Sequence, residues 1–189
     1  MTLLEAIEAR HSVRKYKDEP IPEEILVILR DRIREINEKA SLHIQLVTGE
    51  PKAFSGLMAY GSFSGVKNYL VMVGKKGDDL DEKIGCYIAL GYGQTQGKGH
   101  KVKDIKEISN ASDVTPIWFK KGVEAAILAP TAVNQQKFYL EYLGFQDHSK
   151  VPSVSARPLF SMVGYSKIDL GIVKYHFEIG AGKENFKWI

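Results

Sequence analysis

The stretch "EARHSVRKY", residues 8–16, places two guanidinium groups and a hydroxyl at alternate positions: Arg10, Ser12 and Arg14. In an extended chain, side chains two residues apart lie on the same face. Such a face could meet one anionic or acceptor-rich partner, since guanidinium groups bind phosphate and carboxylate in fixed geometries. A surface turn with ordinary charges fits the same residues, so this stretch alone leaves both interpretations open.

A second stretch, "GYGQTQGKGHKVK", runs from Gly91 to Lys103 and joins a glycine-rich turn to two lysines. It is not a dinucleotide fingerprint, because position 96 is Gln where that motif needs its third glycine. It is not a phosphate-binding P-loop, because Tyr92 stands where that motif needs its first glycine. Lys101 and Lys103 can share one side of an extended segment and hold a phosphate. A solvated basic loop is the plainer alternative.

The third stretch, "LAPTAVNQQKF", begins at Leu128 and follows an apolar, alanine-rich run. Pro130 ends that run, Thr131 and Ala132 are small enough for close approach to the backbone, and the Asn134 amide both donates and accepts. A loop of this kind suits the edge of a planar heterocycle. By itself it also fits a polar turn after the end of a helix.

Side chains that usually carry catalysis are not arranged for it in this sequence. The five histidines do not pair at metal-ligand spacing with each other or with Cys86, the one cysteine, so we expect no metal site and no thiol nucleophile. A serine nucleophile lacks its strand-turn-helix elbow. We therefore predict no catalytic side chain, and we expect a bound cofactor to supply the chemistry.

The hydrophobic pattern predicts the elements that carry these stretches. Helices are expected over Thr2–Ala9, from Pro22 through Ile36, from Asp79 onward, over Thr115–Leu128, and over Asp169–Ile179, with Gly180 and Gly182 as terminators. Strands are expected at His43–Val47, Asn68–Val73, Cys86–Leu90, Phe138–Leu143 and Leu159–Val163. This irregular alternation predicts an α+β fold, with a mixed, largely antiparallel sheet flanked by helices.

Composition sets the class of protein. The 189 residues are 44% hydrophobic and 26% charged, which suits one well-buried domain over residues 1–189. The net charge of +3 comes from basic residues interspersed with acids, so we expect no nucleic-acid partner. The first ten residues lack the apolar core of a signal peptide, and the apolar runs are too short to cross a membrane. We expect a cytoplasmic protein.

Two segments, "DLDEKIG" (residues 79–85) and "KIDLGIV" (residues 167–173), look like related acidic helix openings. Each follows an expected strand and a short turn. This loose echo predicts two related halves in one chain, approximately residues 1–110 and 111–189.

Taken together, these stretches resemble the FMN-dependent nitroreductase family, most of all its small bacterial subfamily of putative nitroreductases. "EARHSVRKY" resembles the R-[RH]-S-x-[RK]-x-[FY] motif, and "APTAVNQQKF" resembles the A-P-S-x-x-N-x-Q-P-W loop. "ALGYGQTQGKGHKVK" is similar to the family's strand, G-Y-[PG] turn and basic tail, and the segment from Lys167 to Phe186 resembles its long glycine-bounded helix.

The resemblance implies a set of FMN-binding residues. Arg10 and Ser12 would hold the ribityl-phosphate, with His11 between them in the motif, and Arg14 would approach the pyrimidine end of the flavin. Lys101 and Lys103 would bind the phosphate. The residues facing the ring would be Pro130, Thr131, Ala132 and Asn134.

The activity implied is reduction of nitroaromatic, quinone or related electrophilic small molecules, with NADH or NADPH as donor, by ping-pong hydride transfer. Two departures from the family stand out: the A-P-T-A-V-N loop lies in the second half, and a helix-strand segment expected after Gly85 is missing. The alternatives are therefore a flavin-binding protein without turnover and a basic interaction module that uses Lys98–Lys106. Assembly as a homodimer is also open.

Overall fold

The structure is a computed structural model that describes residues 1–55, 63–75, 82–97, 99, 101–146 and 149–189. The chain divides into two compact units. One is continuous and comprises His11–Gly99. The other is assembled from Met1–Arg10 and His100–Ile189. Each unit has its own sheet and its own buried core, and the two are described in turn.

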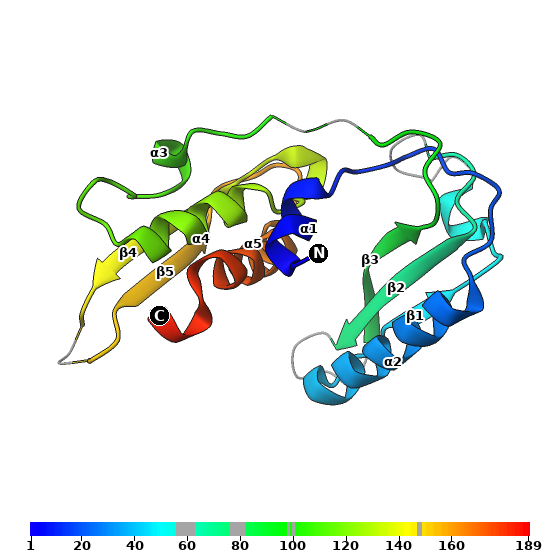
Figure 1. The fold of residues 1–189 in the computed structure, drawn as a ribbon, viewed down its shortest axis with the longest axis horizontal. Coiled ribbons are helices and arrows are strands. Elements are labelled where there is room, and N and C mark those ends of the chain that lie inside the picture. Colours follow the sequence, from blue (N-terminus) through cyan, green and yellow to red (C-terminus); the bar gives the residue numbers. More distant parts are fainter. Residues whose placement is uncertain (56–62, 76–81, 98, 100, 147–148) are drawn as a thin grey trace. The chain divides into compact units, whose positions relative to one another are not determined.

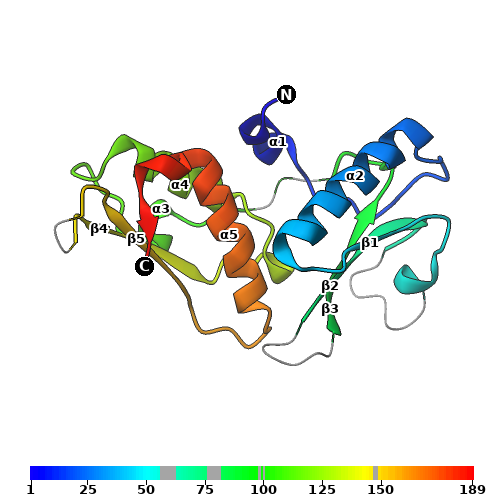
Figure 2. The same ribbon diagram turned by 90° about the horizontal axis from the view of Figure 1, so that it is seen from below.

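The continuous unit is built on a three-stranded antiparallel sheet in the order β1-β2-β3 (Figure 1). The strands are β1 (Gln45–Val47), β2 (Asn68–Lys75) and β3 (Glu82–Leu90). Helix α2 (Glu23–Ala40) lies beside this sheet (Figure 2). The expected strands at His43–Val47, Asn68–Val73 and Cys86–Leu90 are confirmed, with shifted ends.

The predicted helix from Asp79 is wrong where the structure describes it, because Glu82 begins β3. Residues 79–81 lie outside the described part of the chain. Glu82 pairs with Lys75 and Ile84 with Val73, so strand pairing overrides the helix-opening signal of the acidic residues. Gly85 is skipped in the register as a β-bulge, since Met72 pairs with Cys86 and Val73 with Ile84. The strand therefore continues through Gly85, the residue after which the family pattern has a helix-strand segment that this sequence lacks.

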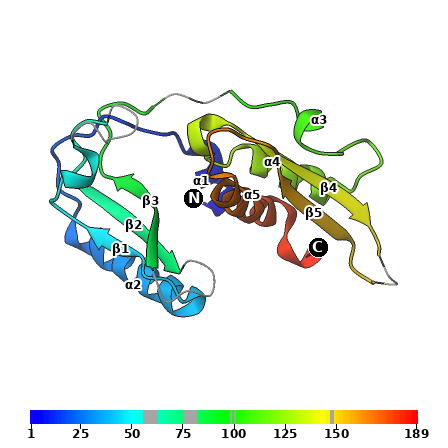
Figure 3. The ribbon, with the colours of Figure 1, turned by 180° about the vertical axis from the view of Figure 1, so that it is seen from behind.

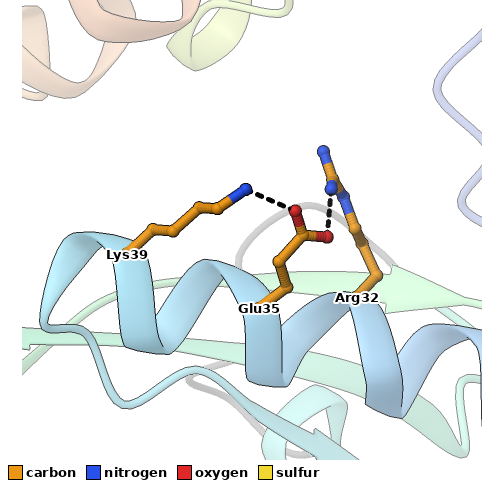
Figure 4. Close-up of polar contacts among 3 residues, drawn as sticks. All are labelled: Arg32, Glu35 and Lys39. Carbon is orange, nitrogen blue, oxygen red and sulfur yellow. Dashed lines mark hydrogen bonds and ion pairs between the residues drawn. The ribbon is translucent and has the colours of Figure 1, made fainter.

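Helix α2 follows the three- and four-residue apolar spacing predicted for it, although Pro22 is its N-cap and not its first residue. Its exposed face carries ion pairs. Figure 4 shows Glu35 between Arg32 and Lys39, with Lys39 Nζ 2.6 Å from a Glu35 carboxylate oxygen. The side-chain hydrogen bonds from Lys39 and from Arg32 hold the pKa of Glu35 below its ordinary value.

The second unit has the sheet β4-β5-β6, formed by β4 (Phe138–Gly144), β5 (Ser153–Pro158) and β6 (Lys187–Trp188). β4 and β5 are antiparallel, whereas β5 and β6 are parallel. The helices are α1 (Leu3–Ala9), α3 (Ile105–Ile108), α4 (Ile117–Ile127) and α5 (Ser166–Ala181). Figure 3 shows α4 and α5 side by side next to β4 and β5. With helices covering sheets in both units, the predicted α+β class is confirmed.

The core of this unit lies between α4, α5 and the sheet. Phe119, Phe177 and Leu140 are fully buried there. Close contact between the helices needs two glycines: a Cβ at Gly122 would lie 2.6 Å from the Phe177 ring, and one at Gly180 would lie 2.4 Å from the Lys121 carbonyl oxygen. Gly180 is thus inside α5, and the helix ends at Gly182, one of its two predicted terminators.

One predicted strand in this unit is wrong. Leu159–Val163 is a loop, and the strand that pairs with β4 is Ser153–Pro158. Val154 of β5 is fully buried, so pairing with β4 and burial select that segment. Much of the apolar run after it is left exposed, including Phe160 and Met162.

Candidate functional site

Within His11–Gly99, the structure joins the first stretch to the glycine-rich turn. Tyr16 and Gly93 form an antiparallel bridge. The Gln94 backbone N–H donates to the Lys15 carbonyl at 2.9 Å, and the Gln94 side-chain Nε2 donates to the Tyr16 carbonyl at 3.1 Å. Backbone pairing within one unit therefore joins the end of the first stretch, at Lys15 and Tyr16, to the glycine-rich start of the second, at Gly93 and Gln94.

Gly97 allows this turn to approach the motif closely. Its φ is +75°, a conformation that glycine adopts without strain. A Cβ there would lie 2.8 Å from the Ser12 carbonyl oxygen and 3.0 Å from the His11 Cβ. The predicted ligands His11 and Ser12 thus have the turn packed against their backbone, while the Arg14 side chain is exposed.

Arg10 belongs to the other unit. It is the C-cap of α1, where its amide donates to the Ala6 carbonyl at 3.0 Å, and burial lowers the pKa of its guanidinium. The predicted ligands therefore divide between the units, with His11, Ser12 and Arg14 in one and the remaining seven in the other.

In that second unit, the lysine segment is bound to the loop after α4. Lys103 donates through its backbone N–H to Gln136 Oε1 and through Nζ to the Gln136 carbonyl, both at 2.9 Å. The Lys101 carbonyl accepts from Asn134 Nδ2 at 2.9 Å and from Gln136 Nε2 at 2.8 Å. Lys101, Lys103 and Asn134, predicted separately, thus meet in one hydrogen-bonded cluster, and the Lys101 side chain is exposed.

The loop that holds this cluster is strained. Val133, Asn134 and Gln136 have φ of +46°, +55° and +44°. Tyr165, which follows the Gly164 carbonyl that accepts from Gln135, has φ of +60°. A left-handed conformation is rare for residues other than glycine and most unusual for a β-branched residue such as Val133. Strain of this kind persists only where surrounding contacts enforce it, and it is concentrated at functional sites.

Asp169 contributes further contacts that hold this loop in shape. The carboxylate is buried in the first turn of α5 and accepts from the Ala132 amide at 3.0 Å and from Gln135 Nε2 at 2.6 Å. Gln135 also donates to the Gly164 carbonyl at 3.1 Å and accepts from the Ser161 hydroxyl. Gln135, Gln136 and Asp169 were not predicted. The polar "NQQ" run was a signal for the glutamines, whereas nothing local indicates that Asp169 bonds to a loop so far back in the chain.

These residues fit an anionic, planar cofactor in their donor chemistry. Pro130, Thr131 and Ala132 are partly buried and present a surface of small side chains. The exposed Lys101 ammonium suits a phosphate, whereas that of Lys103 already donates to Gln136. Lys103 and Asn134 therefore hold the loop in shape, in addition to any contact with a ligand.

The described residues give less support to a metal site or to a cysteine nucleophile. No group of three or more His, Cys, Asp or Glu side chains there could hold a metal ion. Burial raises the pKa of the Cys86 thiol, which disfavours a thiolate nucleophile.

A cavity of about 270 Å³ lies in the continuous unit. It is lined in part by Tyr16, Asp18 and Lys67, and none of the predicted ligands lines it. None of the helices in the described ranges has the length and apolar content that crossing a membrane requires.

Comparison with known proteins identifies relatives of the chain. A sequence model of the family described as "Putative TM nitroreductase" matches residues 2–88 and residues 86–181. The two matched parts overlap at residues 86–88 and confirm that the chain contains two related halves. A crystal structure of a putative nitroreductase from Thermotoga maritima aligns with a TM-score of 0.63 at 20% identity, covering 97% of this chain and 85% of that one. That likeness confirms the nitroreductase-like fold. No curated protein matches the chain.

Proposed function

The chain belongs to the family described as "Putative TM nitroreductase", and from this premise we propose that it is an FMN-dependent NAD(P)H oxidoreductase. Its acceptors are nitroaromatics, quinones or related electrophilic small molecules. Bound flavin would supply the redox chemistry in two half-reactions, so that a quinone, NAD(P)H and a proton yield a hydroquinone and NAD(P)⁺.

The observation that carries the proposal is the strained loop from Thr131 to Gln136. Among the described residues, five other than glycine have positive φ, and three of the five lie in this loop. A fourth, Tyr165, follows Gly164, whose carbonyl is bonded to Gln135. The cost of such conformations suggests that the loop shape is retained for a ligand, and this is the loop that resembles the family's flavin-edge segment.

Different residues of the chain would then bind different parts of the cofactor. Lys101 offers an exposed ammonium for the phosphate, and Arg10 and Ser12 would hold the same end of the cofactor. Arg14 would place a guanidinium near the pyrimidine edge, where it favours negative charge on the ring and so raises the reduction potential. Thr131 and Ala132 would allow the ring to approach the loop backbone.

A second candidate function is flavin binding without turnover. It is favoured by β3, which passes through Gly85 as a bulged strand, so that residues 82–90 form a strand at the place where the family has a helix. The family segment absent there supplies backbone contacts near flavin N5. Binding without efficient hydride transfer would follow if those contacts are needed and are not replaced.

The experiment is a titration of the purified protein with FMN, followed by flavin absorbance and fluorescence, and then an assay of NADH and NADPH oxidation with a quinone or nitroaromatic acceptor. Binding together with acceptor-dependent oxidation supports the oxidoreductase. Binding alone supports the second candidate. A protein that neither carries nor binds FMN would sink both.

Arg14→Ala tests the electrostatic assignment within the same assay. The variant is expected to bind FMN more weakly or to have a lower flavin reduction potential. Lys17→Ala is a matched control, since Lys17 is an exposed cation in the same segment but outside the motif. A variant with wild-type affinity and potential would remove Arg14 from the site.

A further inference from the structure

The segment Leu159–Tyr165, which joins β5 to α5, exposes an unusual amount of apolar surface. Phe160 is 86% exposed, Met162 is 92% exposed and Tyr165 is 59% exposed, with Val163 at 43%. The sequence of the segment, LFSMVGY, contains no charged residue. Exposed apolar groups this closely spaced usually mark a place where another molecule binds.

This apolar segment is held in a defined shape. The Leu159 amide donates to the Lys137 carbonyl at 2.9 Å, and the Val163 amide donates to the Ser161 hydroxyl at 3.1 Å. Gly164 and Tyr165 are both left-handed, with φ of +79° and +60°. A segment fixed at both ends and within its turn presents its side chains in a reproducible arrangement.

The same segment is joined to the proposed flavin-edge loop through Gln135. The Gln135 side chain donates to the Gly164 carbonyl at 3.1 Å and accepts from the Ser161 hydroxyl. It also donates to Asp169, which holds the Ala132 amide. One glutamine therefore ties the exposed apolar segment to the loop that would face the cofactor.

We propose that Phe160, Met162 and Tyr165 form the binding surface for the electron acceptor, and that this acceptor is an uncharged, hydrophobic aromatic molecule. The inference rests on the proposed function, because an acceptor must lie beside the cofactor to receive electrons. Aromatic rings stack on Phe and Tyr, and Met adapts to differently shaped ligands. With no charge in the segment, a charged acceptor gains nothing there over a neutral one.

The size of the surface favours a small molecule over a protein partner. Four side chains expose on the order of a few hundred Å² of apolar surface. A standard protein interface buries about 800 Å² on each partner. Contact with a flat two-ring molecule needs only this smaller area, which favours a small ligand over a second copy of the chain.

The test compares Phe160→Ser/Met162→Ser with Phe145→Ser. Phe145 is 66% exposed and lies in the β4–β5 connection, outside the segment, so it controls for loss of an exposed ring. Binding of 1,4-naphthoquinone to the oxidised, FMN-loaded protein is measured by equilibrium dialysis. Steady-state assays then use the same quinone and, separately, the small anionic acceptor ferricyanide.

The double variant is expected to raise both the dissociation constant and the KM for naphthoquinone about ten-fold, with kcat, FMN affinity and ferricyanide reduction unchanged. Unchanged naphthoquinone binding, or an equal loss in Phe145→Ser, overturns the inference while leaving the oxidoreductase intact. A wild-type dimer that dissociates in the double variant, seen by sedimentation, also overturns it, because a second copy would then cover the surface. Failure of the wild type to bind FMN removes the proposed function and this inference together.

Discussion

The buried carboxylate of Asp169 accepts a hydrogen bond from the backbone amide of Ala132 at 3.0 Å, across a separation of 37 residues. The same carboxylate accepts from Gln135 Nε2 at 2.6 Å. The start of α5 therefore fixes two points in a loop that carries three left-handed residues. The shape of the loop depends on an acid outside it.

Asp169→Asn is expected to lower the free energy of unfolding by about 1–3 kcal/mol, because both partners are donors and one of them must then face the new amide NH₂ group. If the loop binds FMN, affinity for the cofactor should fall as well. Urea unfolding and FMN titration measure the two effects. Asp113→Asn, which changes an exposed acid in the same unit, should leave both unchanged; equal behaviour of the two variants would count against the role of Asp169.

Lys101→Gln is expected to weaken FMN binding roughly ten-fold, since a charged hydrogen bond to phosphate is worth about 1.5–3 kcal/mol, while stability stays unchanged because the side chain is exposed. Lys103→Gln should instead lower stability, because its Nζ donates to the Gln136 carbonyl. Fluorescence titration and thermal unfolding separate the two lysines. Lys106→Gln serves as an exposed control, and a loss of affinity there as large as at Lys101 would point to general electrostatic attraction.

Val133→Gly should stabilise the protein by about 0.5–1 kcal/mol. A left-handed conformation costs an ordinary residue roughly 1–2 kcal/mol, and little burial is lost because Val133 is 64% exposed. Val114→Gly is the matched control: it is 92% exposed and has no positive φ, so glycine there should destabilise by about 0.5–1 kcal/mol through the unfolded chain. Denaturant unfolding of both variants gives the comparison, and destabilisation by both would show that Val133 is not strained.

Gly180→Ala should lower the free energy of unfolding by about 1–3 kcal/mol, because the new methyl group would lie 2.4 Å from the Lys121 carbonyl oxygen and 2.7 Å from the Ala125 Cβ. Gly171 lies in the same helix, and a methyl group added there would have nothing within 4 Å. Gly171→Ala should therefore stabilise the helix by up to about 1 kcal/mol. Thermal unfolding of the pair measures the packing of α4 against α5, and a neutral Gly180→Ala would contradict it.

Stability should decrease on acidification through His176. Burial lowers the pKa of this histidine, the nearby Arg10 charge lowers it further, and the hydrogen bond with the Ala125 carbonyl opposes both. A group with a lowered folded pKa contributes stability above its unfolded value of 6.5, and that contribution is lost as the pH falls from there through the folded pKa. Unfolding free energies measured between pH 8 and pH 5 should show this slope, and His176→Gln should flatten it. An identical slope in the variant would assign the effect to other groups.

Local patterns were sufficient for much of the fold. The helix expected over Thr2–Ala9 is α1, which Thr2 and Glu5 open as a capping box, and the hydrophobic pattern also predicted α2, α4 and α5. The failures occurred where pairing decided the outcome. The acid at Glu82 indicated a helix but pairs with Lys75 in a strand, and the apolar run from Leu159 indicated a strand but is not the segment that pairs with β4.

For the candidate site, the types of the residues in each stretch indicated polar ligands, but the sequence did not indicate which distant residues contact them. The sequence identified Lys101, Lys103 and Asn134, and the structure places them in one cluster. It did not identify Asp169, because a hydrogen bond over 37 residues leaves no periodic or local trace. That these three residues, and Arg10, Ser12 and Arg14 with them, bind a cofactor stays a prediction.

The discontinuous unit also constrains the order in which the parts of the protein fold during synthesis. α1 contacts α4 and α5, and β6 pairs with β5, so this unit needs segments from both ends of residues 1–189. At about 5–20 residues per second, α1 leaves the ribosome roughly ten to thirty seconds before α5 exists. The continuous unit, His11–Gly99, has all of its strands by then. Synthesis therefore favours folding of the continuous unit first, and the first helix docks only after α5 has been made.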